Sequence, residues 1–185
     1  MSKTDPYRLV RGLRVVRRYR PEALPAESLE RILEAGRWTG SSKNNQAWAF
    51  VLVRERAQIQ ALMDCGYFTT PFRGAVAVVA LVRLAKGNDF DIGRVAQNMM
   101  LAAASEGIGS CPVSLHIEDR SASVLGLPPD HRARWAIALG YPAEEAEGEH
   151  RRQLRQALPG GRRPLTDLVH YERWESSRDT RPSGQ

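Results

Sequence analysis

The chain has 185 residues, of which 42% are hydrophobic and 26% charged, a composition typical of a soluble globular protein with one domain or two small ones. No apolar run approaches the ~20 residues of a membrane-spanning helix, and the first residues contain no apolar segment suited to a signal peptide. Cys65 and Cys111 form no paired motif, which favours free thiols in a reducing compartment and predicts a cytoplasmic protein without a metal site.

The first half of the chain alternates between helical and strand patterns. Apolar spacing predicts an amphipathic helix that begins near Pro6 and gives way to extended chain before Pro21. The run 75–84 is continuously apolar, which predicts a strand buried on both faces. The other expected elements are a helix at 25–37, a strand at 47–54, a short helix at 57–63 and a loop at 65–74.

The second half is organised around one apolar helix. Asp91 is a suitable N-cap and Gly107 a suitable terminator, and the small or apolar surface between them predicts a buried helix or a contact between two copies of the chain. Pro112 favours an edge strand or a bulge. Residues 175–185 form a polar tail with too little apolar content to fold alone. The remaining expected elements are strands at 108–117 and 134–142 and short helices at 120–130 and 164–174.

Arginine supplies most of the positive charge behind the formal net charge of +6. Guanidinium groups bind phosphate and carboxylate through paired hydrogen bonds, so this charge favours an anionic partner. A genomic preference for arginine codons is an alternative explanation, since Arg31, Arg54 and Arg56 occupy positions expected at the surface. The arginine-rich first segment is compatible with a solvated helix face or with a basic arm for nucleic acid.

The stretch Trp38 to Trp48, WTGSSKNNQAW, joins a predicted helix to a predicted strand. Its glycine, serine and asparagine residues are typical of an ordinary turn. A loop of small hydrogen-bonding residues between rigid elements is also typical of a binding site. From this stretch alone, both interpretations stay open.

The common catalytic signatures are absent from the sequence: G-x-x-x-x-G-K-[ST], G-x-S-x-G, H-E-x-x-H, and G-x-G-x-x-G at a strand-to-helix turn. His116 lies in a strand pattern without an evident carboxylate or nucleophile, so we interpret it as a structural histidine. The apolar setting of Cys111 raises a thiol pKa rather than lowering it. We therefore predict no catalytic side chain, and a cofactor would have to supply any chemistry.

Four segments together could bind a flat, phosphorylated and partly apolar cofactor. Arginines would hold the phosphate, small polar residues and backbone amides would meet the polar edge, and apolar walls would enclose the ring. These segments are Arg14 to Tyr19, Gly40 to Gln46, Cys111 to Leu115, and the pair Arg162 and Arg163.

Taken in order, these segments resemble the nitroreductase family of FMN-dependent, NAD(P)H-using oxidoreductases. RVVRRYRPEALPAESLERILEAGRW is similar to the family's opening R-S-x-R-x-F motif and helix, and TGSSKNNQAWAFVLV to its P-S-S-x-N-x-Q-P-W segment and strand. DIGRVAQNMMLAAASEGIGSC is similar to its D-x-G-x-A-x-Q-N helix and G-L-G-S turn, and ALGYP with RRPLTDLVHYERW to its closing strand and C-terminal motif. The resemblance runs from about Val10 to Trp174.

The resemblance implies an α+β fold, with a mixed sheet flanked by helices, in an intertwined homodimer with FMN at the subunit interface. It implies one flavin-binding domain at 1–174, followed by the tail at 175–185. The implied flavin-binding residues of one subunit are Arg14, Val15, Arg17, Pro112, Val113, Ser114 and Leu115, with Arg162 or Arg163 near the phosphate. The implied residues of the other subunit are Ser41, Ser42 and Asn44.

The chain departs from the family pattern at several positions. Val15 replaces a flavin-contacting serine, Gly40 and Ala47 replace prolines, and no lysine precedes the strand at 75–84. These differences remove donors to the flavin and bear on cofactor affinity and redox tuning.

The implied reaction transfers hydride from NADH or NADPH through FMN to a small oxidised acceptor such as a nitroaromatic, a quinone or an activated alkene. One alternative keeps the fold but has dehalogenase or flavin-fragmenting activity. Another is a non-catalytic basic protein that binds nucleic acid or a different anion. The chain has neither a recognised nucleic-acid motif nor an apolar span, so we expect neither nucleic acid nor a membrane as its partner.

Overall fold

A computed structural model of the chain describes residues 5–157 and 161–174, and in residues 154–157 it describes the backbone alone. The chain divides into two compact units, one up to Gly148 and one from Glu149 onward. Over the described residues, no helix is long and apolar enough to cross a membrane.

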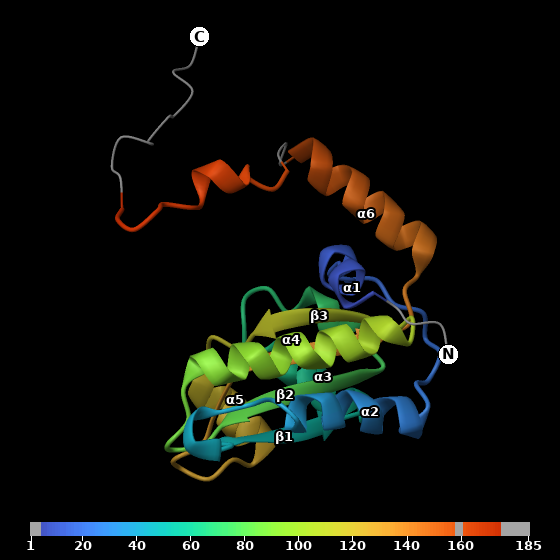
Figure 1. The fold of residues 1–185 in the computed structure, drawn as a ribbon. Coiled ribbons are helices and arrows are strands. Elements are labelled where there is room, and N and C mark those ends of the chain that lie inside the picture. The colour runs from blue at the N-terminus through green and yellow to red at the C-terminus, as the bar shows by residue number, and fades with distance from the viewer. Residues whose placement is uncertain (1–4, 158–160, 175–185) are drawn as a thin grey trace. The chain divides into compact units, whose positions relative to one another are not determined.

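The first unit is built on a four-stranded antiparallel sheet with the strand order β1-β2-β4-β3 (Figure 1). β2 is buried along its length except at its last residue, which confirms the prediction of a strand covered on both faces. Pro112 lies in an edge strand, as predicted, because proline has no N–H to offer a neighbouring strand. The strands are β1 (Trp48–Val53), β2 (Ala77–Arg83), β3 (Gly109–Ser114) and β4 (Arg132–Gly140).

Helices cover both faces of this sheet, which confirms the α+β class (Figure 1). On the face covered by α2 and α4, a Cβ atom on Gly36 would lie 2.2 Å from the Cε of Met99. The absent side chain therefore permits the close approach of α2 to α4. One face carries α2 (Ala26–Arg37) and α4 (Asp89–Ser105), and the other carries α3 (Arg56–Met63) and α5 (Glu118–Leu125).

The ends of the predicted helices need two corrections. Asn88, not Asp91, is the N-cap of α4, and its side-chain oxygen accepts the Asp91 N–H at 2.9 Å. Asparagine caps helices as well as aspartate does, so the earlier residue takes this role. The helix predicted at 164–174 is reduced to one 3-10 turn, η3 (Leu165–Asp167), whose residues are all exposed and lack the packing that stabilises short helices. Another 3-10 turn, η2 (Thr70–Arg73), lies in the predicted loop before β2.

Sequence reasoning did not predict α6 (Glu144–Ala157). The segment is an acidic run followed by a basic run, and it has little apolar periodicity. Its first turn holds three glutamates, which interact favourably with the positive end of the helix dipole. This charge order was the available sign of a helix.

The chain after α1 (Pro6–Gly12) is extended, and we call residues 13–20 the N-terminal arm. The Val16 N–H donates to the Ser110 carbonyl oxygen at 2.9 Å, so the arm runs beside β3. A Cβ atom on Gly109 would lie 2.8 Å from Val16 side-chain atoms. Only glycine leaves room for the arm at this position.

Tyr19 attaches the other end of the arm to the end of β4. Its backbone forms an isolated antiparallel bridge with Pro142, and its ring packs where a Cβ on Gly140 would be 3.0 Å away. The hydroxyl donates to the carbonyl oxygen of Val16 at 2.5 Å and lies 3.3 Å from that of Ala138. Burial raises the pKa of Tyr19 far above its usual value, so the hydroxyl remains a donor.

We expect Tyr19→Phe to lower the free energy of unfolding by about 1 kcal/mol, because it removes a buried hydrogen bond and leaves the ring in place. Urea unfolding followed by circular dichroism measures the change. Tyr7→Phe is the control, since the ring of Tyr7 is 67% exposed on α1. Equal loss of stability in both variants would contradict the role given to the Tyr19 hydroxyl.

Cys111 of β3 faces the core between the sheet and α3 and is 3% exposed. Burial raises the pKa of its thiol to about 11, with Arg17 lowering the pKa and the Glu147 carboxylate raising it. Burial also raises the pKa of the Cys65 thiol. These directions confirm the prediction made from the apolar setting of Cys111.

The stability of the protein should fall as the pH rises from about 8.5 toward 11, because the Cys111 thiol ionises first in the unfolded chain. The stabilisation is complete below the pKa of the unfolded thiol and is lost as the pH rises through the pKa of the folded one. Cys111→Ala should reduce the slope of stability against pH in this window by roughly 1 kcal/mol per pH unit. Urea unfolding over this range compares the two slopes, and parallel profiles would contradict the prediction.

Candidate active site

The edge strand β3 has a face with two unsatisfied hydroxyl groups. Ser110 and Ser114 lie four positions apart, so their side chains share the face on which Pro112 is exposed. Both hydroxyl oxygens are buried and have no hydrogen-bond partner among the described residues. A buried hydroxyl without a partner costs about 1–3 kcal/mol, so this face is suited to receive a polar group.

The backbone of β3 adds an outward-facing amide to these hydroxyls. The Leu115 N–H donates to the Arg134 carbonyl oxygen at 2.8 Å, which sets the alternation of hydrogen bonds with β4. By this alternation, the Ser114 N–H points away from β4. The side chains of Val113 and Leu115 are buried in the core, so only their backbone atoms could contact a ligand at this edge.

The N-terminal arm brings the two predicted arginines beside the same strand. Arg14 is exposed, and its Nη1 donates to the carbonyl oxygens of Arg11 and Leu13 at 2.7 and 2.8 Å. Arg17 is half-buried and close enough to Cys111 to lower the pKa of that thiol. The arm therefore places two guanidinium groups along the edge that carries the unsatisfied serines.

Glu147, on α6, fixes the backbone of the arm. Its Oε2 accepts the N–H of Arg17 at 2.8 Å and that of Arg18 at 3.1 Å. The residue is 3% exposed. Sequence reasoning missed Glu147 because α6 was not predicted and because the contact joins residues 130 positions apart.

Two hollows open along β3. One, of about 430 Å³, lies between α1, the arm and the end of α4, and is lined by Arg14 and Ser110 among others. The other, of about 370 Å³, is lined mainly by apolar residues of the sheet and α4, including Ile92, Met100 and Pro112. A cation and a hydroxyl suit the first hollow to a phosphate, whereas the second suits an apolar ring or a packing side chain.

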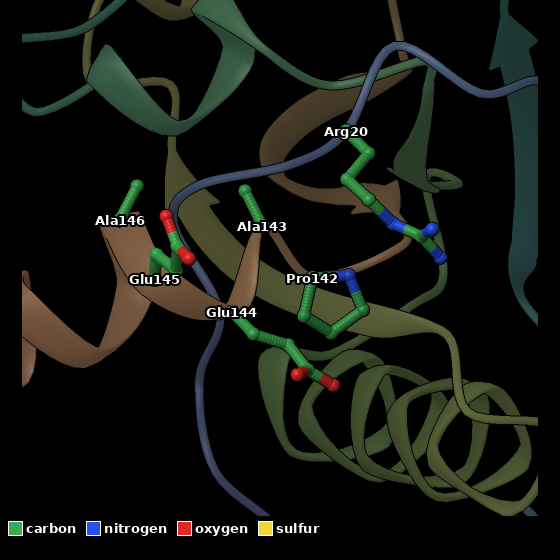
Figure 2. Close-up of a pocket in the computed structure, with 6 residues that line it drawn as sticks. All are labelled: Arg20, Pro142, Ala143, Glu144, Glu145 and Ala146. Carbon is green, nitrogen blue, oxygen red and sulfur yellow. The ribbon is translucent and has the colours of Figure 1, made fainter.

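A further hollow, of about 510 Å³, lies where the chain leaves β4 (Figure 2). Its lining includes Arg20, Pro142, Glu144 and Glu145, and Figure 2 shows the Glu144 carboxylate near Pro142 and that of Glu145 farther away. Arg20 already pairs with Glu22 at 3.3 Å. Because carboxylates repel an anion, the hollow beside Arg14 is the better place for a phosphate.

The loop between α2 and β1 has a strained backbone. Lys43, Asn44 and Gln46 have positive φ values of 53°, 54° and 47°. Such conformations cost roughly 1–3 kcal/mol each in residues other than glycine and are concentrated at functional sites. Ser41 Oγ accepts the Gln46 N–H at 2.9 Å and thereby holds the loop together. The strain favours the binding interpretation of this stretch over that of an ordinary turn.

The structure does not bring this loop to β3 within one chain. β1 and β3 are opposite edges of the sheet, three strand spacings or roughly 14 Å apart. Arg94 of α4 donates to the Gly40 carbonyl oxygen at 2.6 Å, whereas the hollow beside Arg14 reaches Ala104. Positions 94 and 104 are roughly 15 Å apart along a helix. Ser41, Ser42 and Asn44 therefore belong to a different place on the chain than the arginines do.

For three further predicted site residues, the described contacts give less direct support for a place in the site. Val15, where the family has a serine, is half-buried and packs against buried apolar residues on both sides of the sheet. Arg162 and Arg163 lie in the second unit, where both are exposed and Arg163 Nη2 donates to the Asp167 carbonyl oxygen at 2.9 Å. Their part in the site stays a prediction.

His116 lies just beyond β3 and is exposed, so it does not serve the core as the structural interpretation expected. Its ring contacts those of Tyr67 and Phe68. Sequence reasoning placed these two aromatic residues in a loop and gave them no role.

Known proteins with related sequences and folds match nearly the whole chain. A protein of Methanothermobacter thermautotrophicus with the provisional name NADH dehydrogenase/NAD(P)H nitroreductase is 28% identical, with 94% of this chain and 90% of that protein covered. A provisionally named nitroreductase of Desulfovibrio desulfuricans, solved in complex with FMN, has a TM-score of 0.74 at 28% identity and covers 94% of this chain and 100% of its own. The structure of a similarly named protein from Parabacteroides distasonis has a TM-score of 0.79 at 18% identity, with 93% and 100% covered.

The model of one family, described as the nitroreductase family, matches residues 10–81 and 64–141. Together these matches include the arm, the strained loop, α4 and all four strands. They span well over half of the chain. The protein therefore belongs to the nitroreductase family.

Proposed function

We propose that this protein is an FMN-dependent oxidoreductase that transfers reducing equivalents from NADH or NADPH to a small oxidised acceptor. The observation that carries the proposal is the edge of β3, where two buried serine hydroxyls without partners lie beside an arm bearing Arg14 and Arg17. Membership of the nitroreductase family and the FMN complex of the D. desulfuricans relative support the same cofactor.

The residues at this edge fit a flavin nucleotide. Arg14, beside the hollow of about 430 Å³, and Arg17 are suited to the phosphate and the polar edge of the ring. The hydroxyls of Ser110 and Ser114 and the Ser114 N–H are suited to hydrogen bonds with the ring and its side chain. We include Arg162 or Arg163 as a further cation near the phosphate.

FMN, when bound, supplies the redox chemistry by accepting a hydride equivalent from the nicotinamide and passing two electrons to the acceptor. Overall, NAD(P)H and one proton become NAD(P)⁺, while a quinone becomes a hydroquinone, or a nitro group becomes a nitroso group and water. The protein residues position the reactants and compensate negative charge with Arg14 and Arg17. The proposed mechanism requires no side chain to act as an acid or a base.

We further propose that the site is completed by a second copy of the chain. In one chain, the strained loop with Ser41, Ser42 and Asn44 is separated from β3 by the width of the sheet. A two-fold pairing would bring the loop of one copy to the β3 edge of the other. The apolar hollow along α4 and the exposed side chains of Leu168 and Trp174 are suited to contacts within such a dimer.

The proposal retains a flavin-binding domain that spans 1–174, with a tail at 175–185, and a cytoplasmic location. The tail lies outside the described residues.

We expect the purified protein to bind FMN and Arg17→Ala to weaken that binding about 10-fold or more, because a hydrogen bond to a charged group contributes about 1.5–3 kcal/mol. Titration of the FMN-free protein, followed by flavin fluorescence, measures the dissociation constant. Arg54→Ala is the control, since this arginine is exposed after β1. A wild-type protein that binds no FMN would refute the proposed function, and equal affinities of both variants would remove Arg17 from the site.

If each FMN site is shared by two chains, a dimer of two different FMN-binding variants should recover FMN binding at one of its two sites. Arg17→Ala removes a group from the β3 side, and Asn44→Gly removes a side chain from the loop side while permitting its positive φ. Each variant alone should retain little FMN. In a mixed dimer one site carries both changes and the other carries neither, so FMN content should return to about half of the wild-type value.

Coexpression with two different affinity tags isolates the mixed dimer, and absorbance in the visible range measures its FMN content. If both groups served the same site within one chain, every site in the mixed dimer would carry one change. FMN content would then stay as low as in the single variants, and the shared site would be refuted.

A further inference from the structure

Three aromatic rings form an exposed cluster, the aromatic shelf, which consists of Tyr67, Phe68 and His116. The side chains of Tyr67 and Phe68 are 76% and 79% exposed. Their ring centroids lie 5.3 and 6.5 Å from that of His116, at interplanar angles of 36° and 66°. Contiguous exposed patches mark binding sites more often than single exposed residues do.

The backbone that carries the shelf is firmly attached to the body of the domain. The Ile117 N–H donates to the carbonyl oxygen of Cys65, which is fully buried, at 2.9 Å. On the other side of the rings, the Thr69 hydroxyl donates to the Met63 carbonyl oxygen at 2.7 Å. Thr69 itself is buried. The chain is thus fixed before and after two rings that project into solvent.

The shelf borders the edge at which we place the flavin ring. A Cβ atom on Gly66 would lie 2.4 Å from the Ser114 carbonyl oxygen, so the loop that carries Tyr67 touches the end of β3. His116 follows Ser114 by two positions. Ser114 also has the unsatisfied hydroxyl and the outward N–H described above. Rings at this position can contact a molecule that lies against the flavin.

We propose that the aromatic shelf binds the flat ring of an electron-poor acceptor, such as a nitroaromatic or a quinone, and so determines the acceptor class. This inference rests on the proposed function. An electron-poor ring stacks favourably on the negative face of the phenol of Tyr67 or the ring of Phe68. An acceptor without a flat conjugated ring has no comparable face and gains little from the shelf.

The double variant Tyr67→Leu/Phe68→Leu tests this proposal, because it keeps an apolar surface and removes the aromatic faces. Calorimetric titration of the FMN-loaded protein with 4-nitrobenzoate, without nicotinamide, should give a dissociation constant about 10-fold higher than that of the wild type. Phe90→Leu is the matched control, since Phe90 is 75% exposed in the first turn of α4. Its dissociation constant should equal that of the wild type.

Steady-state kinetics give a second measurement. In the double variant, KM for 4-nitrobenzoate should rise by a similar factor, while turnover of ferricyanide, an acceptor without a ring, should stay unchanged. Unchanged 4-nitrobenzoate binding in the double variant would overturn the proposed role of the shelf in acceptor binding. So would a double variant that sediments as a monomer beside a dimeric wild type, because the rings would then serve the subunit contact.

The control reactions distinguish refutation of the role proposed for the shelf from refutation of the proposed function. If the wild type neither retains FMN nor reduces ferricyanide with NADH or NADPH, the proposed function fails and the shelf fails with it. If ferricyanide reduction is intact in both proteins and 4-nitrobenzoate binds them equally, only the shelf is refuted.

Discussion

The attachment of the N-terminal arm to β3 is the constraint on which the candidate site depends. The bond from the Val16 N–H to Ser110 fixes the arm beside the strand, and Glu147 fixes the backbone at Arg17. Beside the strand, Arg14 is exposed and Arg17 is half-buried. The small residue at Gly109 is part of the same contact, because any side chain there would push the arm away. Backbone contacts of the arm therefore position these arginines.

Because β3 is an edge strand, some of its backbone groups remain available to hydrogen-bond a ligand. In an interior strand, the backbone N–H and C=O groups form hydrogen bonds with two neighbouring strands. An edge strand has one neighbour, so alternate groups stay unpaired. Pro112 lacks one donor, which limits pairing of this edge with another strand, and the Ser114 N–H remains an outward donor. The strained loop lies at the opposite edge. The sheet thus separates two groups of predicted binding residues by its full width.

The sequence predicted the elements with strong patterns and missed the contacts between distant segments. Continuous hydrophobicity identified β2, and proline chemistry placed Pro112 at an edge. The resemblance to a family suggested Arg14 and Arg17 as site residues, and their role stays a prediction. Composition could not predict that Glu147 meets the arm or that Ser110 lacks a partner, because both depend on tertiary packing. α6 was not predicted because many of its residues are charged and its few apolar residues give no clear helical periodicity.

Both ends of the loop between α2 and β1 are held by hydrogen bonds where the family pattern has prolines. Proline restricts backbone conformation in the relatives' motif, but this chain has Gly40 and Ala47 at those positions. Here Arg94 donates to the Gly40 carbonyl oxygen, and the Ala47 carbonyl oxygen accepts the Leu84 N–H at 3.1 Å. Hydrogen bonds to α4 and to the chain after β2 thus replace the lost covalent restriction at both ends of the loop. Because these bonds fix the ends, the strained residues between them can hold positive φ values without proline.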